Sequence, residues 1–238
     1  MKRFSWLLVL VLLAACNDEP AIVKKDDKPE NPAKDPKIVE QESDEQESKE
    51  FIEFTLPDEE VLINLEMVPI LDAYLQGVEN RDQTIEDMDM QHINADNRNL
   101  YLLEFSCTDG LCSYLLLDRT NKNQTYLVAD LAKSVSIKLS PDSSKILFHF
   151  NREQSELPAS NIVVFHLDKW KSMPLANVTG EEDVLDYTWT VLTAKWADND
   201  RIKATIPDMD SRSDEAIQQW ENNGRLTKEV EFTLDTDN

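Results

Sequence analysis

The chain has 238 residues and a formal net charge of −23 at pH 7. Such a charge repels phosphate backbones and anionic lipid headgroups, which argues against nucleic-acid binding and against membrane contact through a basic patch. The chain contains only four glycines, at Gly77, Gly110, Gly180 and Gly224. Because phosphate-binding loops need clustered glycines for close backbone approach, this spacing excludes the usual nucleotide-binding loops.

The first sixteen residues carry a targeting pattern. A cationic start, Met1-Lys2-Arg3, precedes an apolar run to Leu13 that is too short to remain as a membrane span. The run ends in Leu13-Ala14-Ala15-Cys16, the pattern of the bacterial lipobox, and the segment resembles the signal sequence of bacterial membrane lipoproteins. The resemblance implies that a signal peptidase recognises Leu13, Ala14 and Ala15 and cuts before Cys16. An ordinary secretory signal followed by a chance cysteine is the alternative.

In that family the cysteine becomes the lipidated first residue, so Cys16 would carry a thioether-linked diacylglycerol and a further acyl chain such as palmitate. The protein would then be anchored in the cell membrane on its extracytoplasmic side. Loss of Lys2 and Arg3 with the signal peptide would take the net charge from −23 to −25.

The two remaining cysteines, Cys107 and Cys112, would lie outside the cytoplasm, where thiols tend to pair. We therefore expect a disulfide between them. Four residues separate them, whereas thioredoxin-like redox motifs have two, so a redox-catalytic pair is the less favoured interpretation.

Residues 17–50 are rich in Asp, Glu, Lys, Gln and Ser and have almost no apolar side chains. Such a segment does not bury enough surface to offset the entropy of ordering. We expect residues 16–50, including the lipidated Cys16, to form a disordered acidic tether, on the order of 30 Å long as a coil and about 100 Å when stretched. The acidic run 40–50 has a partner-binding tail as its alternative interpretation.

Residues 51–238 predict a single, mostly β folded domain. Residues 51–56 alternate as in a short edge strand, and the segment 57–60 resembles a helix start with an early proline and three carboxylates. Helical spacing over 67–78 predicts short helices divided near Pro69, with a strand over 61–68 as the alternative. Residues 79–94 are expected to form a loop.

From residue 100 the pattern changes to β. Strands over 100–106 and 113–119 flank an Asp-Gly turn, and pairing of Cys107 with Cys112 places Leu103 opposite Leu116. Both faces of this hairpin are apolar, which predicts a central place in a sheet. Further strands are predicted over 125–128, 135–139, 162–167, 202–206, 217–220 and 226–234.

The segment Ser140-Pro141-Asp142-Ser143-Ser144-Lys145-Ile146-Leu147-Phe148 resembles the Ser-Pro-Asp-Gly turn and strand of TolB-like and prolyl-oligopeptidase-type β-propeller repeats. Weaker echoes occur at 95–100 and 197–202. The resemblance implies propeller-like blades, and another antiparallel β architecture is the alternative, since a plain Asp-Asn turn before a strand looks the same. The predicted fold class is mainly β, with antiparallel meander sheets or propeller-like blades and one or two short N-terminal helices.

Few residues point to chemistry. Ordinary strand histidines are the favoured interpretation of His149 and His166, and the alternative is a metal site that these two residues form with Asp168. The loop 208–215 faintly resembles a calcium loop but lacks its glycine and has Arg212 at a ligand position. Four tryptophans suggest either a carbohydrate platform or core residues: Trp170, Trp189, Trp196 and Trp220.

The sequence therefore predicts no catalytic residue, no metal site and no cofactor, and a non-catalytic protein is favoured over an enzyme. We expect a membrane-anchored extracytoplasmic lipoprotein that acts as a binding or interaction module in the cell envelope. Its partners would be the membrane, through the lipid on Cys16, and a basic envelope protein or polymer, with no nucleic acid. The alternatives are an envelope hydrolase or metal-dependent enzyme, and a small-ligand sensor with a deep apolar pocket.

Overall fold

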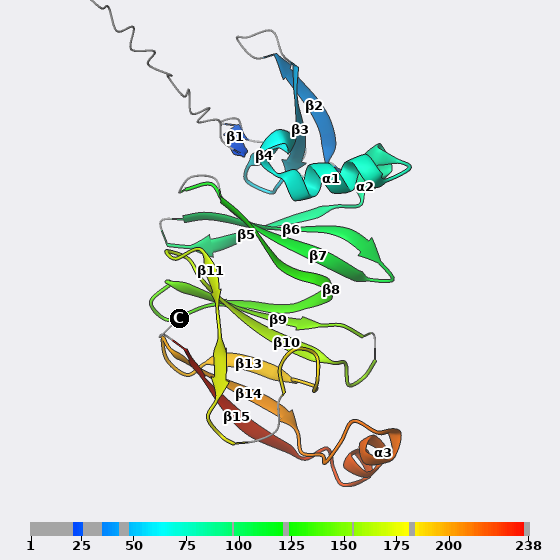
Figure 1. The fold of residues 1–238 in the computed structure, drawn as a ribbon, viewed down its shortest axis with the longest axis vertical. Coiled ribbons are helices and arrows are strands. Elements are labelled where there is room, and N and C mark those ends of the chain that lie inside the picture. The colour runs from blue at the N-terminus through cyan, green and yellow to red at the C-terminus, as the bar shows by residue number, and fades with distance from the viewer. Residues whose placement is uncertain are drawn as a thin grey trace, which may run out of the picture.

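The structure is a computed structural model that describes residues 21–25, 35–42, 48–96, 98–120, 124–153, 155–180 and 184–235. Its fold is mainly antiparallel β-sheet, as the sequence predicted. The predicted signal segment and Cys16 lie outside the described residues. Figure 1 shows sheets stacked along the longest axis of the molecule, with the first and last strands in the chain at opposite ends.

The first sheet has the strand order β1-β4-β3-β2. Its strands are β1 (Ile22–Lys25), β2 (Lys37–Glu42), β3 (Ser48–Thr55) and β4 (Glu60–Asn64). A short 3-10 helix and two α-helices then lead to the next sheet: η1 (Leu65–Met67), α1 (Pro69–Gly77) and α2 (Arg81–Glu86). Helix α1 lies in the segment 67–78, for which the sequence predicted short helices, and α2 lies in a segment predicted as a loop.

The second sheet is a seven-stranded meander in sequence order. Its strands are β5 (Asp89–Ala95), β6 (Arg98–Thr108), β7 (Leu111–Asp118), β8 (Gln124–Leu139), β9 (Lys145–Asn151), β10 (Ser160–His166) and β11 (Lys171–Met173). The third sheet has the order β12-β15-β14-β13. It contains β12 (Leu175–Asn177), β13 (Thr193–Trp196), β14 (Arg201–Pro207) and β15 (Thr227–Leu234), and α3 (Asp214–Asn222) lies between β14 and β15.

Strand β8 bends the seven-stranded sheet into two layers. Its first half pairs with β7 and its second half with β9, and the register shifts where Leu131 adopts a φ of 47°. Such a bulge bends a strand and increases its twist. The described chain thus forms four stacked layers: β1–β4, β5 to the first half of β8, the second half of β8 to β11, and β12–β15. Because the outer layers lie at opposite ends of the stack (Figure 1), the layers do not close into a ring of blades.

Each gap between layers holds its own apolar cluster, to which alternate residues of one strand contribute. Tyr101 and Leu103 of β6 point into the gap between the first and second layers, and Leu102 points into the next gap. Likewise Phe148 of β9 fills the gap between the second and third layers, and Leu147 the last gap. Strands covered on both faces need apolar residues at every position. This explains the two apolar faces of the predicted hairpin.

The tether prediction is wrong for residues 22–25 and 37–42, which form β1 and β2. Ile22 is 1% exposed in the first core, and the Lys37 Nζ lies 3.0 Å from Glu53 Oε1. Lys25 pairs with the other oxygen of the same carboxylate. The charged residues that suggested disorder therefore form ion pairs between strands of the first sheet. This sheet needs only a few apolar residues from β1 and β2.

Several element predictions in the folded part were also wrong. The segment 57–60 is a turn, closed by a 2.8 Å hydrogen bond from the Leu56 N–H to the Glu59 carbonyl, and strand β4 follows it. Strand β3 is internal rather than an edge strand. The predicted loop 79–94 contains α2 and β5. The predicted strand 217–220 belongs to α3, because Ser213 caps that helix by accepting a hydrogen bond from the Ala216 N–H at 3.3 Å.

The hairpin of β6 and β7 is confirmed, but its predicted register is off by one residue. Leu103 lies opposite Leu115 instead of Leu116, because a bulge between Phe105 and Thr108 places Ser106 at a φ of 54°. The predicted disulfide between Cys107 and Cys112 is confirmed, with a Cα–Cα distance of 4.1 Å. The bulge lies beside the two cysteines and shifts the register of the hairpin. The cysteines therefore form the disulfide although Leu103 and Leu116 are not opposite each other.

Candidate functional site

The three aspartate turns seen in the sequence have one structural role. In each, the strand that follows begins at a cationic residue: β6 at Arg98, β9 at Lys145 and β14 at Arg201. The turns thus repeat once in the second, third and fourth layers. The aspartate lies within the turn of a hairpin and the cation begins the following strand, which is why the pattern was visible in the sequence.

The Asp142 turn shows how the aspartate fixes the backbone. Its Oδ1 accepts hydrogen bonds from the Ser140 hydroxyl at 2.6 Å and the Ser144 N–H at 3.1 Å. The Ser140 hydrogen bond is the main reason that the pKa of Asp142 is lowered to about 2. Ser143 adopts a φ of 56°, the left-handed conformation for which propeller turns use glycine. The turn geometry therefore persists without the glycine.

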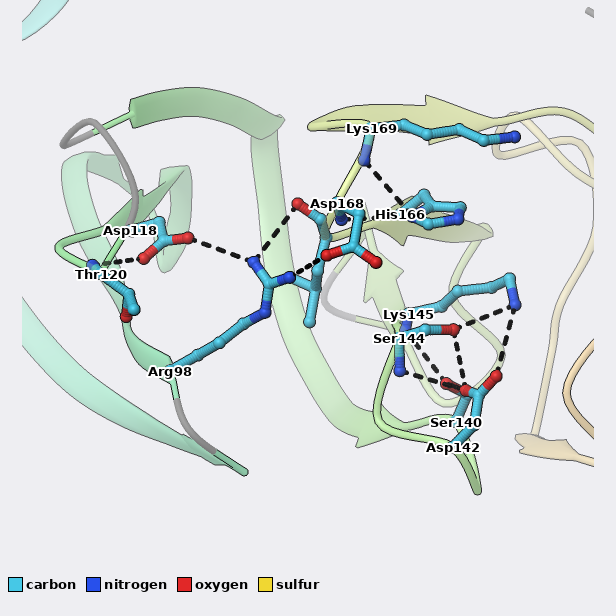
Figure 2. A network of polar contacts seen from close by, with 11 residues as sticks. Arg98, Asp118, Thr120, Ser140, Asp142, Ser144, Lys145, His166, Asp168 and Lys169 are labelled. Carbon is cyan, nitrogen blue, oxygen red and sulfur yellow. Dashed lines mark hydrogen bonds and ion pairs between the residues drawn. The ribbon is translucent and has the colours of Figure 1, made fainter.

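Arg98 joins the second layer to the third, as Figure 2 shows. Its Nη1 lies 3.4 Å from Asp118 Oδ2 and donates to the Leu167 carbonyl at 3.5 Å, and its Nη2 pairs with Asp168. The Asp118 side chain is 1% exposed, so Arg98 neutralises a buried carboxylate. A buried charge of this kind is stable only when it is paired.

The next turn makes the same type of link between the third and fourth layers. Lys145 Nζ lies 3.3 Å from Asp200 Oδ1, and the Asp142 N–H donates to the Asn199 side chain at 3.1 Å. Each of these charged groups already has a partner of opposite sign or a backbone hydrogen bond. The Arg98 and Asp142 turns therefore act as clamps between layers, whereas the cation of the third turn, Arg201, pairs with Asp198 and Glu231 within the fourth layer.

The residues of the alternative metal or hydrolase site, His149, His166 and Asp168, do not converge. His149 is opposite Ile162 on β10, and His166 lies four residues further along that strand, which is about 13 Å away. His166 Nδ1 accepts the Asp168 N–H at 3.2 Å, and the Asp168 carboxylate is held by Arg98 (Figure 2). The three side chains therefore have no common centre.

Both histidines have environments that favour the neutral ring. His149 is 1% exposed, and its pKa is lowered to about 4, chiefly by burial and also by Lys138. The pKa of His166 is lowered by burial and by the nearby Lys145 and Lys169 ammonium groups. Buried His149 Nε2 has no hydrogen-bond partner among the described residues. His149 is thus an ordinary core histidine, as the favoured interpretation has it.

A second cluster surrounds the disulfide. Glu104 Oε1 lies 3.2 Å from Cys112 Sγ and 3.7 Å from Cys107 Sγ. Within the described parts of the chain, these three residues are the one group whose metal-ligand atoms all lie within 4.8 Å of one another. Metals bind cysteine as the thiolate, and the two sulfurs here are bonded to each other. With the disulfide formed, the Glu104 carboxylate is therefore the one metal ligand that this group offers.

Two hollows flank helix α3. The larger, of about 390 Å³, lies between α3 and the β9–β10 connection and has Leu157 and Ile217 among its lining residues. Its lining also carries four carboxylates, from Glu153, Glu156, Asp214 and Glu221. The smaller, of about 160 Å³, is lined on the other side of α3 by Asp208, Asp210 and Trp220 among others. Neither hollow was predicted from the sequence, because residues 217–220 were assigned to a strand.

The segment 208–215, which faintly resembles a calcium loop, leads into α3 and includes the first two residues of that helix. Arg212 Nη2 pairs with Glu153 Oε2 at 2.9 Å and donates to the Leu157 carbonyl at 3.1 Å. A guanidinium thus occupies the place where a calcium ligand would be needed. Nor do the four tryptophans form a platform. Their rings pack within or against two different core clusters: Trp170 in one, and Trp189, Trp196 and Trp220 in the other.

No protein-family model, curated protein or solved structure matches the chain. In the described part of the chain, no helix is long and apolar enough to cross a bilayer. Functional conclusions consequently depend on the lipobox residues and on the surfaces described above.

Proposed function

We propose that the protein is a membrane-anchored extracytoplasmic lipoprotein whose folded part is a non-catalytic module that binds a basic partner in the cell envelope. The motif Leu13-Ala14-Ala15-Cys16 supports the anchor. Signal peptidase cuts before Cys16, and the acyl chains on that residue hold the protein to the membrane. Two or more chains are needed for stable attachment, since a single chain binds only marginally.

The hollow between α3 and the β9–β10 connection is the observation that carries the binding role. Four carboxylates line it, and three of them have a cation nearby: Glu153 lies 2.9 Å from Arg212, and Arg225 lies 2.8 Å from Glu221 and 3.9 Å from Glu156. Two arginines thus face four carboxylates, so the lining keeps an excess of negative charge. Leu157 and Ile217 supply apolar surface in the same hollow. A lysine- or arginine-containing segment with one apolar side chain is complementary to this combination, because opposite charges guide association and the apolar contact adds affinity.

The position of the hollow suits a partner that approaches from outside the membrane. Helix α3 lies at the opposite end of the stack from β1, the described strand nearest the anchor (Figure 1). A partner bound beside α3 would therefore not compete with the bilayer for the same surface. The overall charge of −23 would increase the association rate of a cationic partner at low salt.

Charge reversal in the hollow tests this function. Glu156 is suited to it because its side chain is 86% exposed, so Glu156→Lys should leave the fold intact. Glu86→Lys on α2, at the other end of the stack, is the matched control. The acylated wild type and the control should retain the same defined partner from envelope extract at low salt, and Glu156→Lys should lose it. Identical capture by all three proteins, or no partner at any salt concentration, would refute the proposal.

A further inference from the structure

The chain between the lipid anchor and the first sheet is short. The Ala21 carbonyl accepts a 2.7 Å hydrogen bond from the Asn64 N–H, and Ala21 and Ile22 are each 1% exposed. Ala21 therefore has a fixed place at the edge of the first layer. Five residue steps from Cys16 to Ala21 reach at most about 18 Å, even when fully extended.

That reach limits how far the first layer can be from the bilayer. The headgroup region on each side of the hydrocarbon core is roughly 5–8 Å thick, and the lipidated cysteine starts at its inner boundary. The edge of the first layer would thus be within about 10–13 Å of the headgroup surface. A disordered tether of residues 16–50 would set no such limit.

Two exposed apolar side chains lie next to the point where the anchored chain enters the fold. Asn64, the partner of Ala21, directly precedes η1, in which Met67 is 39% exposed. Ile70, in the first turn of α1, is 40% exposed. Their neighbours Leu65 and Leu71 are buried in the first core, so the helical segment has an inner apolar face and a smaller outer one.

We propose that this outer face, made by Met67 and Ile70, rests on the membrane that holds the lipidated Cys16. The inference depends on the proposed anchoring and adds the surface that meets the bilayer. The occupant is the headgroup region of a zwitterionic membrane, because a strongly acidic protein is repelled by anionic lipid. Apolar side chains at the headgroup boundary are a common mode of peripheral membrane contact. Helix α3 lies at the opposite end of the stack from the first layer and α1 (Figure 1).

Fluorescence quenching on acylated protein tests the proposed contact. A fluorophore is attached at Met67→Cys or Ile70→Cys, and at Leu226→Cys near α3 as the control, since Leu226 is 60% exposed. The labelled proteins are placed in phosphatidylcholine vesicles that contain a nitroxide-labelled headgroup lipid. We expect quenching at positions 67 and 70 to exceed that at position 226 at least twofold. Equal quenching at all three positions would overturn the inference.

Two further measurements separate this inference from the proposed anchoring. Mass spectrometry of the same samples reports acylation of Cys16, so an unmodified cysteine refutes the proposed function itself. Insertion of twenty Gly and Ser residues after Asn17 keeps the lipobox but lengthens the connection. We expect quenching at position 67 then to fall towards the value at position 226. Undiminished quenching in this variant would contradict the role of the short connection.

Discussion

The Asn64 backbone N–H donates to the Ala21 carbonyl at 2.7 Å, which fixes the chain five residues after Cys16 to the end of β4. The next residue, Ile22, is 1% exposed and belongs to the core between the first and second layers. Folding of the first layer therefore includes residues that composition alone assigns to a spacer. The proposed anchor and the folded part are consequently joined by only a few residues.

Replacement of Ile22 by alanine should destabilise the protein by about 2–4 kcal/mol, because a buried aliphatic side chain leaves a cavity when it is truncated. Urea unfolding of the mature chain measures this change. Val178→Ala is the control, since Val178 is 53% exposed and should change stability by less than about 0.5 kcal/mol. An Ile22→Ala variant as stable as wild type would mean that β1 does not contribute to the fold.

Glu53→Gln should weaken the first layer in a pH-dependent way. Burial alone would raise the pKa of Glu53, but the Lys25 and Lys37 ammonium groups outweigh it, so the pKa lies below the usual 4.5. The carboxylate thus contributes stability above pH 4.5 that is lost as pH falls through the lowered pKa. At pH 7 we expect a loss of about 1–3 kcal/mol on substitution, since the partner lysines are part-exposed and can rehydrate. Unfolding curves from pH 7 to pH 3 should show the two proteins converging, and a constant difference would contradict this role.

Arg98→Ala should cost about 2–4 kcal/mol, because it leaves the buried Asp118 carboxylate without its cation. Arg201→Ala is the matched control at the start of β14, where the side chain is 52% exposed and its ion pairs are worth little. In the Arg98→Ala background, Asp118→Asn should restore part of the lost stability by removing a buried charge that has lost the Arg98 guanidinium. Purely additive losses in this double-mutant cycle would show that the two residues are not coupled.

His149 should make the protein acid-sensitive between about pH 6.5 and pH 4. The unfolded histidine takes up a proton near pH 6.5, whereas the folded one stays neutral until its pKa of about 4. The unfolded state binds more protons in this range, so stability falls as pH falls, by up to about 3 kcal/mol. His149→Gln should flatten this part of the stability profile, and His92→Gln, at an exposed position, should leave it unchanged. An unaltered profile for His149→Gln would assign the acid sensitivity to other groups.

Local patterns were enough to predict much of the third and fourth layers. Val230, Phe232 and Leu234 alternate with polar residues and all three point into the core, as expected for β15. The aspartate turns were visible because they repeat a local sequence. The disulfide was predicted from the number of cysteines and the expected extracytoplasmic compartment, not from the geometry of the hairpin. The pairing was therefore right although the predicted hairpin register was wrong.

The errors have a common physical origin in contacts that are distant in the sequence. Lys25 and Glu53 are 28 positions apart, so the ion pair that orders β1 has no local signature. Arg98 and Asp168 are 70 positions apart, and their pairing depends on how the second and third layers stack. For α3, the spacing of Ile217 and Trp220 fits a helical period. The segment around them is short and polar, so the sequence did not show which face of a helix would be buried.

The proposed lipid anchor on Cys16 is tested by mass spectrometry of the N-terminal peptide from protein purified out of its native membrane. We predict that Cys16 is the first residue and carries a thioether-linked diacylglycerol, with residues 1–15 absent. Detection of residues 1–15 on the purified product, or of an unmodified Cys16 thiol on protein released into the medium, would contradict it.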